Sequence, residues 1–433
     1  MPHRRPPQRL PGSALTTPQF LMLFGAMLVA ASGNTAVQSV MPAIGRAMKI
    51  PDVVVAIAYT VSAILWVIMA PVWARASDVR GRKALILLGV SGFAVSSMLC
   101  GLALEAGIHG LVSGAAAFVL FGLARAFYGA LGSATPSATQ AYLASRTRRS
   151  ARVASLTSLS SSFGLGTVLG PAIAPLFVLP WIGLPGPFFG FALVGLAMLG
   201  AIAIWLPDDT KPRHGPRPGH GAAMSYPSLA SSPTGASVIA ATAPRGGKKM
   251  RWRDPRIARW IGAGIAAGHA QAALLTFLGF FLIDRLHLPP MGSEKSIAIV
   301  LMAGAGATLA AQWGLIPRLG LKPRTMIVAG ALAAAAGFGV LLLARDLYTL
   351  VIGFALASLG FGFTRPGFTA GASLAVPLAE QGGVAGVITA ANGVSYVAAP
   401  TVTMLLYRID PLLPVALAML LLLGLALWGR RAL

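Results

Sequence analysis

The sequence predicts an all-α membrane protein with twelve transmembrane helices in two pseudo-symmetric six-helix bundles. Of its 433 residues, 56% are hydrophobic and 10% are charged, whereas a soluble protein carries about 25% charged residues. Uncharged windows of about 20 residues, long enough to span a bilayer, recur along the whole chain. Continuous apolar windows indicate helices, because a membrane β-barrel alternates apolar and polar residues. Two of the windows resemble each other, which suggests that one half duplicates the other.

Six apolar windows precede a polar interval, and six follow it. The predicted spans are 18–44, 53–75, 84–105, 112–143, 152–178 and 186–206, followed by 257–284, 294–316, 325–344, 347–376, 383–407 and 411–429. The fourth and tenth windows exceed the bilayer thickness, which we interpret as tilt or extension beyond the membrane rather than as two spans each. The predicted domains are a cytosolic tail (1–17), a first bundle (18–206), a central loop (207–255) and a second bundle (256–433).

The net charge is +23, and most basic residues lie between the predicted spans. With successive turns assigned to alternate faces, 26 of the 34 Lys and Arg residues fall on the face of the two termini and 6 on the other face. The positive-inside rule then places both termini in the cytosol of a cell with a bacterial-type inner (plasma) membrane. Because topology explains the basic excess, we expect the lipid bilayer and not nucleic acid as a partner. Cys100 is the single cysteine, which excludes an intrachain disulfide.

Residues 207–255 differ in composition from both halves. They are rich in Pro, Gly, Ser, Thr and His, contain Asp208 and Asp209 at their start, and close with the basic run 245–253. Such a segment lacks the apolar residues of a packed core and is typical of a flexible linker. We therefore expect a flexible cytosolic loop whose basic end lies near anionic lipid headgroups.

Arginine interrupts two otherwise uncharged windows at matching places. Arg125 lies within 106–145 and Arg365 within 347–379, in the similar phrases GLAR and GFTR. A guanidinium at the bilayer centre costs roughly 3 kcal/mol, so it persists only where it faces a bundle interior or a watery cavity. The matching contexts indicate one helix duplicated in the two halves of a transporter.

The turn after the second span carries a motif that resembles a known one. It reads ARASDVRGRKALI from Ala74 to Ile86 and resembles the loop signature of the major facilitator superfamily. The matching positions are Asp78, Gly81, Arg82 and Lys83, while Ala74 and Val79 depart from the signature. Gly81 allows a sharp turn, and Asp78 suits the positive N-terminal end of a neighbouring helix. The resemblance implies the fold of this superfamily and a latch that holds the cytosolic side closed for part of the transport cycle.

Two further segments resemble the same superfamily. Arg125 and Gly129 match the pattern of its fourth span, with Tyr128 in place of the usual Gln. In the fifth span, GLGTVLGPAIAP resembles the glycine–proline signature of drug–proton antiporters, which implies export and a conformational gate. The matching residues are Gly166, Gly170 and Pro171. Ser145 stands where relatives often have an acid that pairs with the loop, so a charge latch through Arg82 needs another partner.

Polar side chains at mid-membrane depth are the candidates for substrate binding, because such folds bind substrate there between the halves. They are Asn34, Gln38, Tyr59, Arg125, Tyr128, His269, Gln271, Arg365, Asn392 and Tyr396. Asn34 and Gln38 are spaced i, i+4 and share a helix face. His269 and Gln271 are two positions apart, so on a regular helix they point to roughly opposite sides. Both reach the cavity only if the helix is broken, for example at Gly268.

The coupling ion and the charge of the substrate follow from the same set of residues. None of the 11 acidic residues lies at the centre of a predicted span, so His269 is the central group that can change charge near neutral pH. We expect it to carry protons if transport is proton-coupled, with Asp284 as the alternative. Two central arginines favour an anionic or zwitterionic substrate, whereas the fifth span favours efflux of amphipathic compounds.

The sequence therefore predicts a secondary active transporter that works by alternating access and exports small organic or amphipathic compounds. Coupling to protons and a facilitator or exchanger that needs no ion are the two alternatives for its driving force. The alternative on the same fold is an importer or exchanger of a small organic anion. A membrane enzyme is disfavoured because the acid pair Asp208 and Asp209 has no adjacent His or Cys. We expect a monomer with no cofactor and no metal ion, whose partner is a small-molecule substrate.

Overall fold

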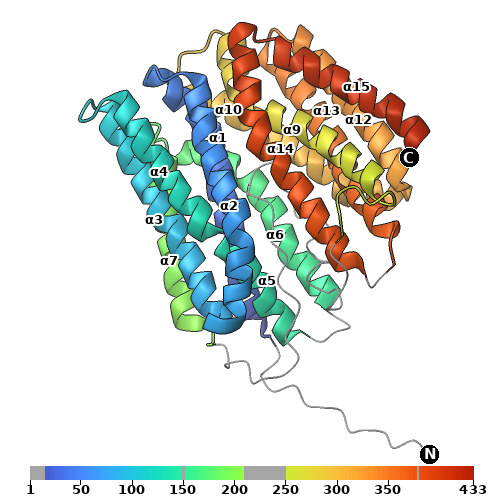
Figure 1. The fold of residues 1–433 in the computed structure, drawn as a ribbon. Coiled ribbons are helices and arrows are strands. Elements are labelled where there is room, and N and C mark those ends of the chain that lie inside the picture. Colours follow the sequence, from blue (N-terminus) through green and yellow to red (C-terminus); the bar gives the residue numbers. More distant parts are fainter. Residues whose placement is uncertain (1–14, 148–151, 209–249, 378–379) are drawn as a thin grey trace, which may run out of the picture.

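The computed structural model describes residues 15–147, 152–208, 250–377 and 380–433. Most of the predicted tail 1–17 and of the predicted central loop 207–255 therefore lies outside the described residues. Within the described ranges, twelve helical spans form two halves that lie side by side, with the first half in blue to green and the second in yellow to red (Figure 1).

The first half holds six spans, one of them divided by a single residue. They are α1 (Thr17–Ala47), α2 (Asp52–Arg80), α3 (Arg82–Ile108), α4 with α5 (Gly114–Gly132 and Ala134–Arg146), α6 with the 3-10 turn η1 (Arg152–Ile173 and Ala174–Phe177), and α7 (Gly186–Trp205). Only Ser133 separates α4 from α5, and one apolar stretch, Gly114–Leu143, continues across it. The structure thus confirms that the long fourth window is one span.

The second half repeats this arrangement. Its elements are α9 (Ala258–Arg285), α10 with a π-helical turn η2 and α11 (Ser293–Leu309, Ala310–Leu315 and Ile316–Leu319), α12 (Pro323–Leu343), α13 (Leu347–Leu374), α14 (Gln381–Ile409) and α15 (Leu413–Ala432). Ten of the twelve spans are long and apolar enough to cross a membrane. The other two, α6 and α14, are rich in Ser, Thr and Gly, and each packs between a helix of its own half and one of the other half.

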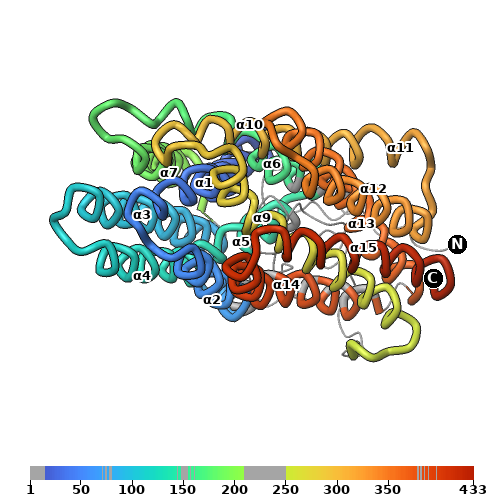
Figure 2. Tube along the Cα trace, turned by 90° about the horizontal axis from the view of Figure 1, so that it is seen from above, coloured from blue at the N-terminus to red at the C-terminus, as the bar shows by residue number. Residues whose placement is uncertain are grey.

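The same helix pairs pack in both halves. The pair α1 and α6 of the first half corresponds to α9 and α14 of the second half, and the pair α2 and α4 corresponds to α10 and α13. In the same way, α3 packs on α4 and α7, and α12 packs on α13 and α15. The contacts between the halves are also paired, because α2 packs on α14 and α6 packs on α10 (Figure 2). These matching pairs confirm the predicted architecture of two pseudo-symmetric six-helix bundles.

Gly81 forms the turn of the loop motif between α2 and α3. Its φ of +93° lies in a region that L side chains adopt only with strain. Lys83, at the start of α3, donates to the carbonyl of Ala203 and pairs with the carboxylate of Asp208, both at 3.0 Å. These contacts hold α3 to the end of α7 within the same half. Arg82 is half-buried, and the side chain of Asp78 lies outside the described residues, so the latch stays a prediction.

Gly166 and Gly170 let α6 approach α1 closely. A Cβ at Gly170 would overlap the carbonyl oxygen of Ser32, and the Thr35 hydroxyl donates to the carbonyl of Gly166 at 3.3 Å. Small residues at such positions allow two membrane helices to pack backbone to backbone. Pro171 lies inside the last turn of α6, before the chain passes into η1. The role of these residues as a conformational gate stays a prediction.

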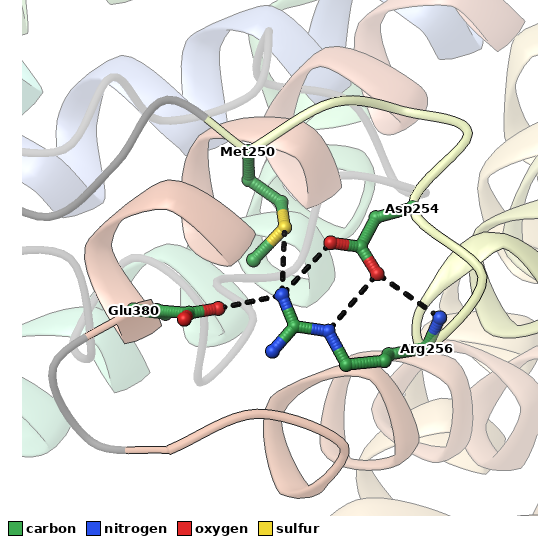
Figure 3. Close-up of polar contacts among 4 residues, drawn as sticks. All are labelled: Met250, Asp254, Arg256 and Glu380. Atoms are coloured by element: carbon green, nitrogen blue, oxygen red, sulfur yellow. Dashed lines mark hydrogen bonds and ion pairs between the residues drawn. The ribbon is translucent and has the colours of Figure 1, made fainter.

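The chain enters the second half through an exposed charge cluster before α9. The guanidinium of Arg256 bonds at 2.8 Å both to Asp254 and to Glu380, and it lies 4.0 Å from the sulfur of Met250 (Figure 3). Hydrogen bonds from the side chain and the backbone N–H of Arg256 lower the pKa of the Asp254 carboxyl below its ordinary value. The predicted domain boundary at residue 256 falls in this cluster, which holds the chain before α9 to the start of α14.

Candidate functional site

The two halves line a central chamber of about 90 Å³. α1 and α2 line it from the first half, and α9 and α14 line it from the second. The lining side chains that can hydrogen-bond are Gln38, Tyr59 and Thr276. The other lining residues are Met41, Pro42, Val55, Ala56, Ala63, Ala272, Leu275, Phe280 and Pro400. The chamber thus combines apolar walls with a few neutral polar groups, which is the usual composition of a small-molecule site.

Ion pairs join the halves beside the chamber, at the membrane face that carries the α1–α2 turn. We call this the opposite face. The face that carries Asp208 and Met250 is called the linker face. Arg46 at the end of α1 donates to Asp52 of α2 at 2.8 and 2.9 Å, and to Asp284 of α9 at 2.9 Å. The Tyr407 hydroxyl of α14 donates to the same Asp284 oxygen at 2.7 Å. These four residues, the gate cluster, therefore connect four helices from both halves.

The gate cluster is in direct contact with the chamber. Phe280 lines the chamber one helical turn before Asp284, and the Arg46 guanidinium lies 5.7 Å from the centroid of its ring. The paired side chains of Arg46, Asp52 and Asp284 are 18 to 32% exposed, so water screens their attraction only in part. Sequence reasoning missed Arg46, Asp52 and Tyr407. The available signal was that Arg46 and Asp52, opposite in charge, flank one short turn.

Arg125 lies in a buried cluster adjoining the chamber wall. Its side chain is 3% exposed, and its Nη2 donates to Asn34 Oδ1 at 2.5 Å. The guanidinium carbon is 5.2 Å from the ring centroid of Tyr59 and 4.9 Å from that of Tyr128, which are cation–π distances. Tyr59 lines the chamber, whereas Arg125 is not one of the described lining residues. The structure thus brings four of the predicted site residues together, with Tyr59 as their contact with the chamber.

Arg365 lines a second, much smaller cavity of about 10 Å³ inside the second half. The polar side chains around it are Gln271 of α9, Thr364 and Arg365 of α13, and Asn392 of α14. A third cavity, also of about 10 Å³, shares Gln271 with the second cavity and Leu275 with the chamber, so the three follow one another along α9. Arg125 and Arg365 therefore occupy separate sites in this structure rather than one common cavity.

His269 and Gln271 point to different sides of α9, which is unbroken at Gly268. Gln271 faces the second and third cavities. The Nδ1 atom of His269 lies 2.8 Å from the carbonyl oxygen of Ile265 and 3.2 Å from the hydroxyl of Ser395 on α14. His269 thus lies at the contact between α9 and α14. The side chain of Tyr396, also on α14, lies outside the described residues.

A helical bundle of two like halves around a central chamber has the architecture of a secondary transporter. Such proteins bind a small molecule between the halves and open to each side of the membrane in turn. Residues 23–400 match the Major Facilitator Superfamily. The chain belongs to this family of multi-pass membrane transporters, which are not enzymes.

The fold is similar to that of solved transporters. The crystal structure of the human organic anion transporter MFSD10 (TETRAN) matches with a TM-score of 0.62 at 16% identity, covering 98% of this chain and 100% of that chain. A mutant of the nucleoside transporter NupG matches with a TM-score of 0.64 at 11% identity, covering 96% of this chain and 98% of that chain. At these identities the similarity shows the fold alone. A search of curated proteins gave no match.

Proposed function

We propose that this transporter exports small amphipathic organic compounds by alternating access. The composition of the chamber carries the proposal. Its polar lining groups, Gln38, Tyr59 and Thr276, are neutral, and the rest of the described lining is apolar. Such a site suits an apolar body with a few hydrogen-bonding groups. The proposed setting is a bacterial-type inner membrane, with the basic linker face and both termini in the cytosol.

The packing of α6 on α1 supports export as the direction. The glycine–proline segment of α6, which resembles the signature of drug–proton antiporters, packs on the helix that supplies Gln38 to the chamber. A bend at Pro171 would therefore shift a chamber wall. The second candidate function is import or exchange of a small organic anion. It is favoured by the buried Arg365 beside the second cavity.

We further propose that His269 carries the proton in exchange. Its imidazole contacts Ser395 at the packing surface of α9 and α14, two helices that line the chamber. We expect His269→Ala to flatten the pH dependence of transport, because the change removes the proposed proton carrier. Initial transport rates in vesicles between about pH 5.5 and 8.5 would measure the effect. His287→Asn, at an exposed turn beyond α9, is the matched control. A retained pH profile in His269→Ala would reject the assignment.

Transport by the purified chain in proteoliposomes tests the function as a whole. A panel of radiolabelled amphipathic drugs and organic anions is supplied with and without an imposed pH gradient. We expect amphipathic compounds to be carried from the compartment on the side of the linker face to the other compartment. Protons that move in the opposite direction should drive this transport. Movement of small anions alone would support the second candidate. Transport rates that are the same with and without the pH gradient would reject proton coupling.

A further inference from the structure

The linker face of the second half carries a large excess of positive charge. Within the described ranges 250–377 and 380–433, this face holds nine Lys or Arg residues and two acids, Asp254 and Glu380. The opposite face of the same half is balanced, with four basic and four acidic residues. Both acids of the linker face pair with Arg256, so its excess charge belongs to the other eight basic residues. The nine are Arg251, Arg253, Arg256, Arg259, Arg318, Lys322, Arg324, Arg430 and Arg431.

Four of these arginines gather around the C-terminal end of α15. Arg259, at the start of α9, donates from Nη1 to the carbonyl of Ala432 at 3.1 Å. Arg324, at the start of α12, donates from Nη2 to the carbonyl of Arg430. A helix leaves its last carbonyl groups unpaired, and its C-terminal end attracts cations. The two bonds therefore bring both side chains to the helix end that carries the exposed Arg430 and Arg431 (Figure 1).

The same end of α15 borders a surface that suits lipid. Three leucines of α15 are 37 to 65% exposed and are spaced i, i+3 and i+7, so they share one helix face. They are Leu420, Leu423 and Leu427. Arg430 and Arg431 continue that face by one further turn. Trp428 beside them is 41% exposed, and Trp is enriched at the level of the lipid headgroups. The face thus passes from hydrocarbon to headgroup level at these arginines.

We propose that the four arginines at the end of α15 bind the phosphate headgroup of an anionic phospholipid. A guanidinium presents paired N–H donors that match phosphate oxygens, and basic sites between membrane helices bind anionic headgroups. Arg430 and Arg431 contact the phosphate directly, while the bonds of Arg259 and Arg324 to α15 hold two further charges beside it. The exposed leucines favour a lipid over free phosphate, because they offer its acyl chains a surface that leads to the same point. Since α9 also lines the chamber, the lipid joins a chamber wall to α12 and α15.

Lipid binding to the purified, delipidated full chain in detergent tests the site. Native mass spectrometry gives the Kd of the first bound dioleoyl phosphatidylglycerol and, separately, of dioleoyl phosphatidylcholine, which has the same acyl chains and no net charge. Each arginine near an anionic headgroup contributes about fivefold, so two direct contacts should make phosphatidylglycerol bind about 25-fold more tightly. The double variant Arg430→Gln, Arg431→Gln should bring the two Kd values together. Arg324→Gln should weaken phosphatidylglycerol alone, by about fivefold.

A matched control separates a defined site from the general charge of the linker face. The double variant Arg251→Gln, Arg253→Gln removes the same charge from exposed positions of that face and should leave both Kd values unchanged. Equal weakening of phosphatidylglycerol by the two double variants would overturn the site, because diffuse surface charge would then explain the binding. Equal Kd values for the two lipids in the wild-type chain would overturn it as well. Displacement of phosphatidylglycerol by an equal concentration of glycerol 1-phosphate would show that the site binds a free phosphate and not a lipid.

Discussion

Arg125→Ala is expected to abolish transport while the chain still inserts into the membrane. The change removes the hydrogen bond from Arg125 to the buried Asn34 oxygen and the cation that contacts the rings of Tyr59 and Tyr128. A hydrogen bond from a charged group contributes about 1.5–3 kcal/mol, and a desolvated cation–π contact about 2 kcal/mol. Tyr59, which lines the chamber, would lose the group that orients it. We expect initial rates in proteoliposomes to fall about 100-fold.

Two further variants distinguish this effect from a general loss of charge. Arg345→Ala removes an exposed arginine at the opposite face and should leave transport unchanged. Arg125→Lys keeps the charge but loses the planar donor fork, so its rate should lie between wild type and Arg125→Ala. Insertion is followed by the amount of monodisperse protein extracted from the membrane fraction. Wild-type transport by Arg125→Ala would remove Arg125 from the site.

The twelve spans could be predicted because the bilayer imposes the same requirement on each of them. A backbone in hydrocarbon must bond within its own helix, so hydropathy alone finds the spans. Their ends are less predictable. The second span was predicted to end at residue 75, but α2 continues to Arg80, so Asp78 belongs to the helix and Gly81 alone makes the turn. Charged residues end a hydropathy window without ending the helical hydrogen bonds.

The sequence indicates which polar residues lie at mid-membrane depth, but it does not show how the structure groups them. Asn34 and Gln38 share a face of α1, yet Asn34 bonds to Arg125 while Gln38 lines the chamber. One face of a helix can contact another helix at one height and border a cavity at another. The spacing of residues in the sequence does not show where the first kind of contact ends and the second begins. The same limit applies to Arg125 and Arg365, whose matching phrases lie in different surroundings.

The gate cluster was beyond sequence reasoning for a different reason. Arg46 and Asp52 are close in the chain, but Asp284 is 238 positions from Arg46. Its pairing with Arg46 depends on how the two halves pack at the opposite face. Sequence reasoning assigned Arg46 to a turn on the less basic face and considered Asp284 only as a proton carrier. In the structure the two residues form an ion pair that joins the halves at the opposite face.

Asp284→Asn is expected to shift the transporter towards conformations open at the opposite face. Asparagine keeps the shape and the hydrogen bond to Tyr407 but cannot form the ion pair that joins Arg46 to the second half. A partly exposed ion pair contributes about 1 kcal/mol, which corresponds to about a fivefold change in the balance of states. Labelling of Thr276→Cys in the chamber by a membrane-impermeant maleimide from the opposite face should accelerate by about that factor.

The labelling experiment has an internal background and a matched control. The native Cys100 is fully buried and contributes little signal. Asp410→Asn changes an exposed acid at the same face whose carboxylate bonds within its own half, so it should leave the labelling rate unchanged. Turnover should fall in Asp284→Asn, because a transporter must close one face before it opens the other. If labelling is no faster than in the control, the Arg46–Asp284 pair does not hold the opposite face closed.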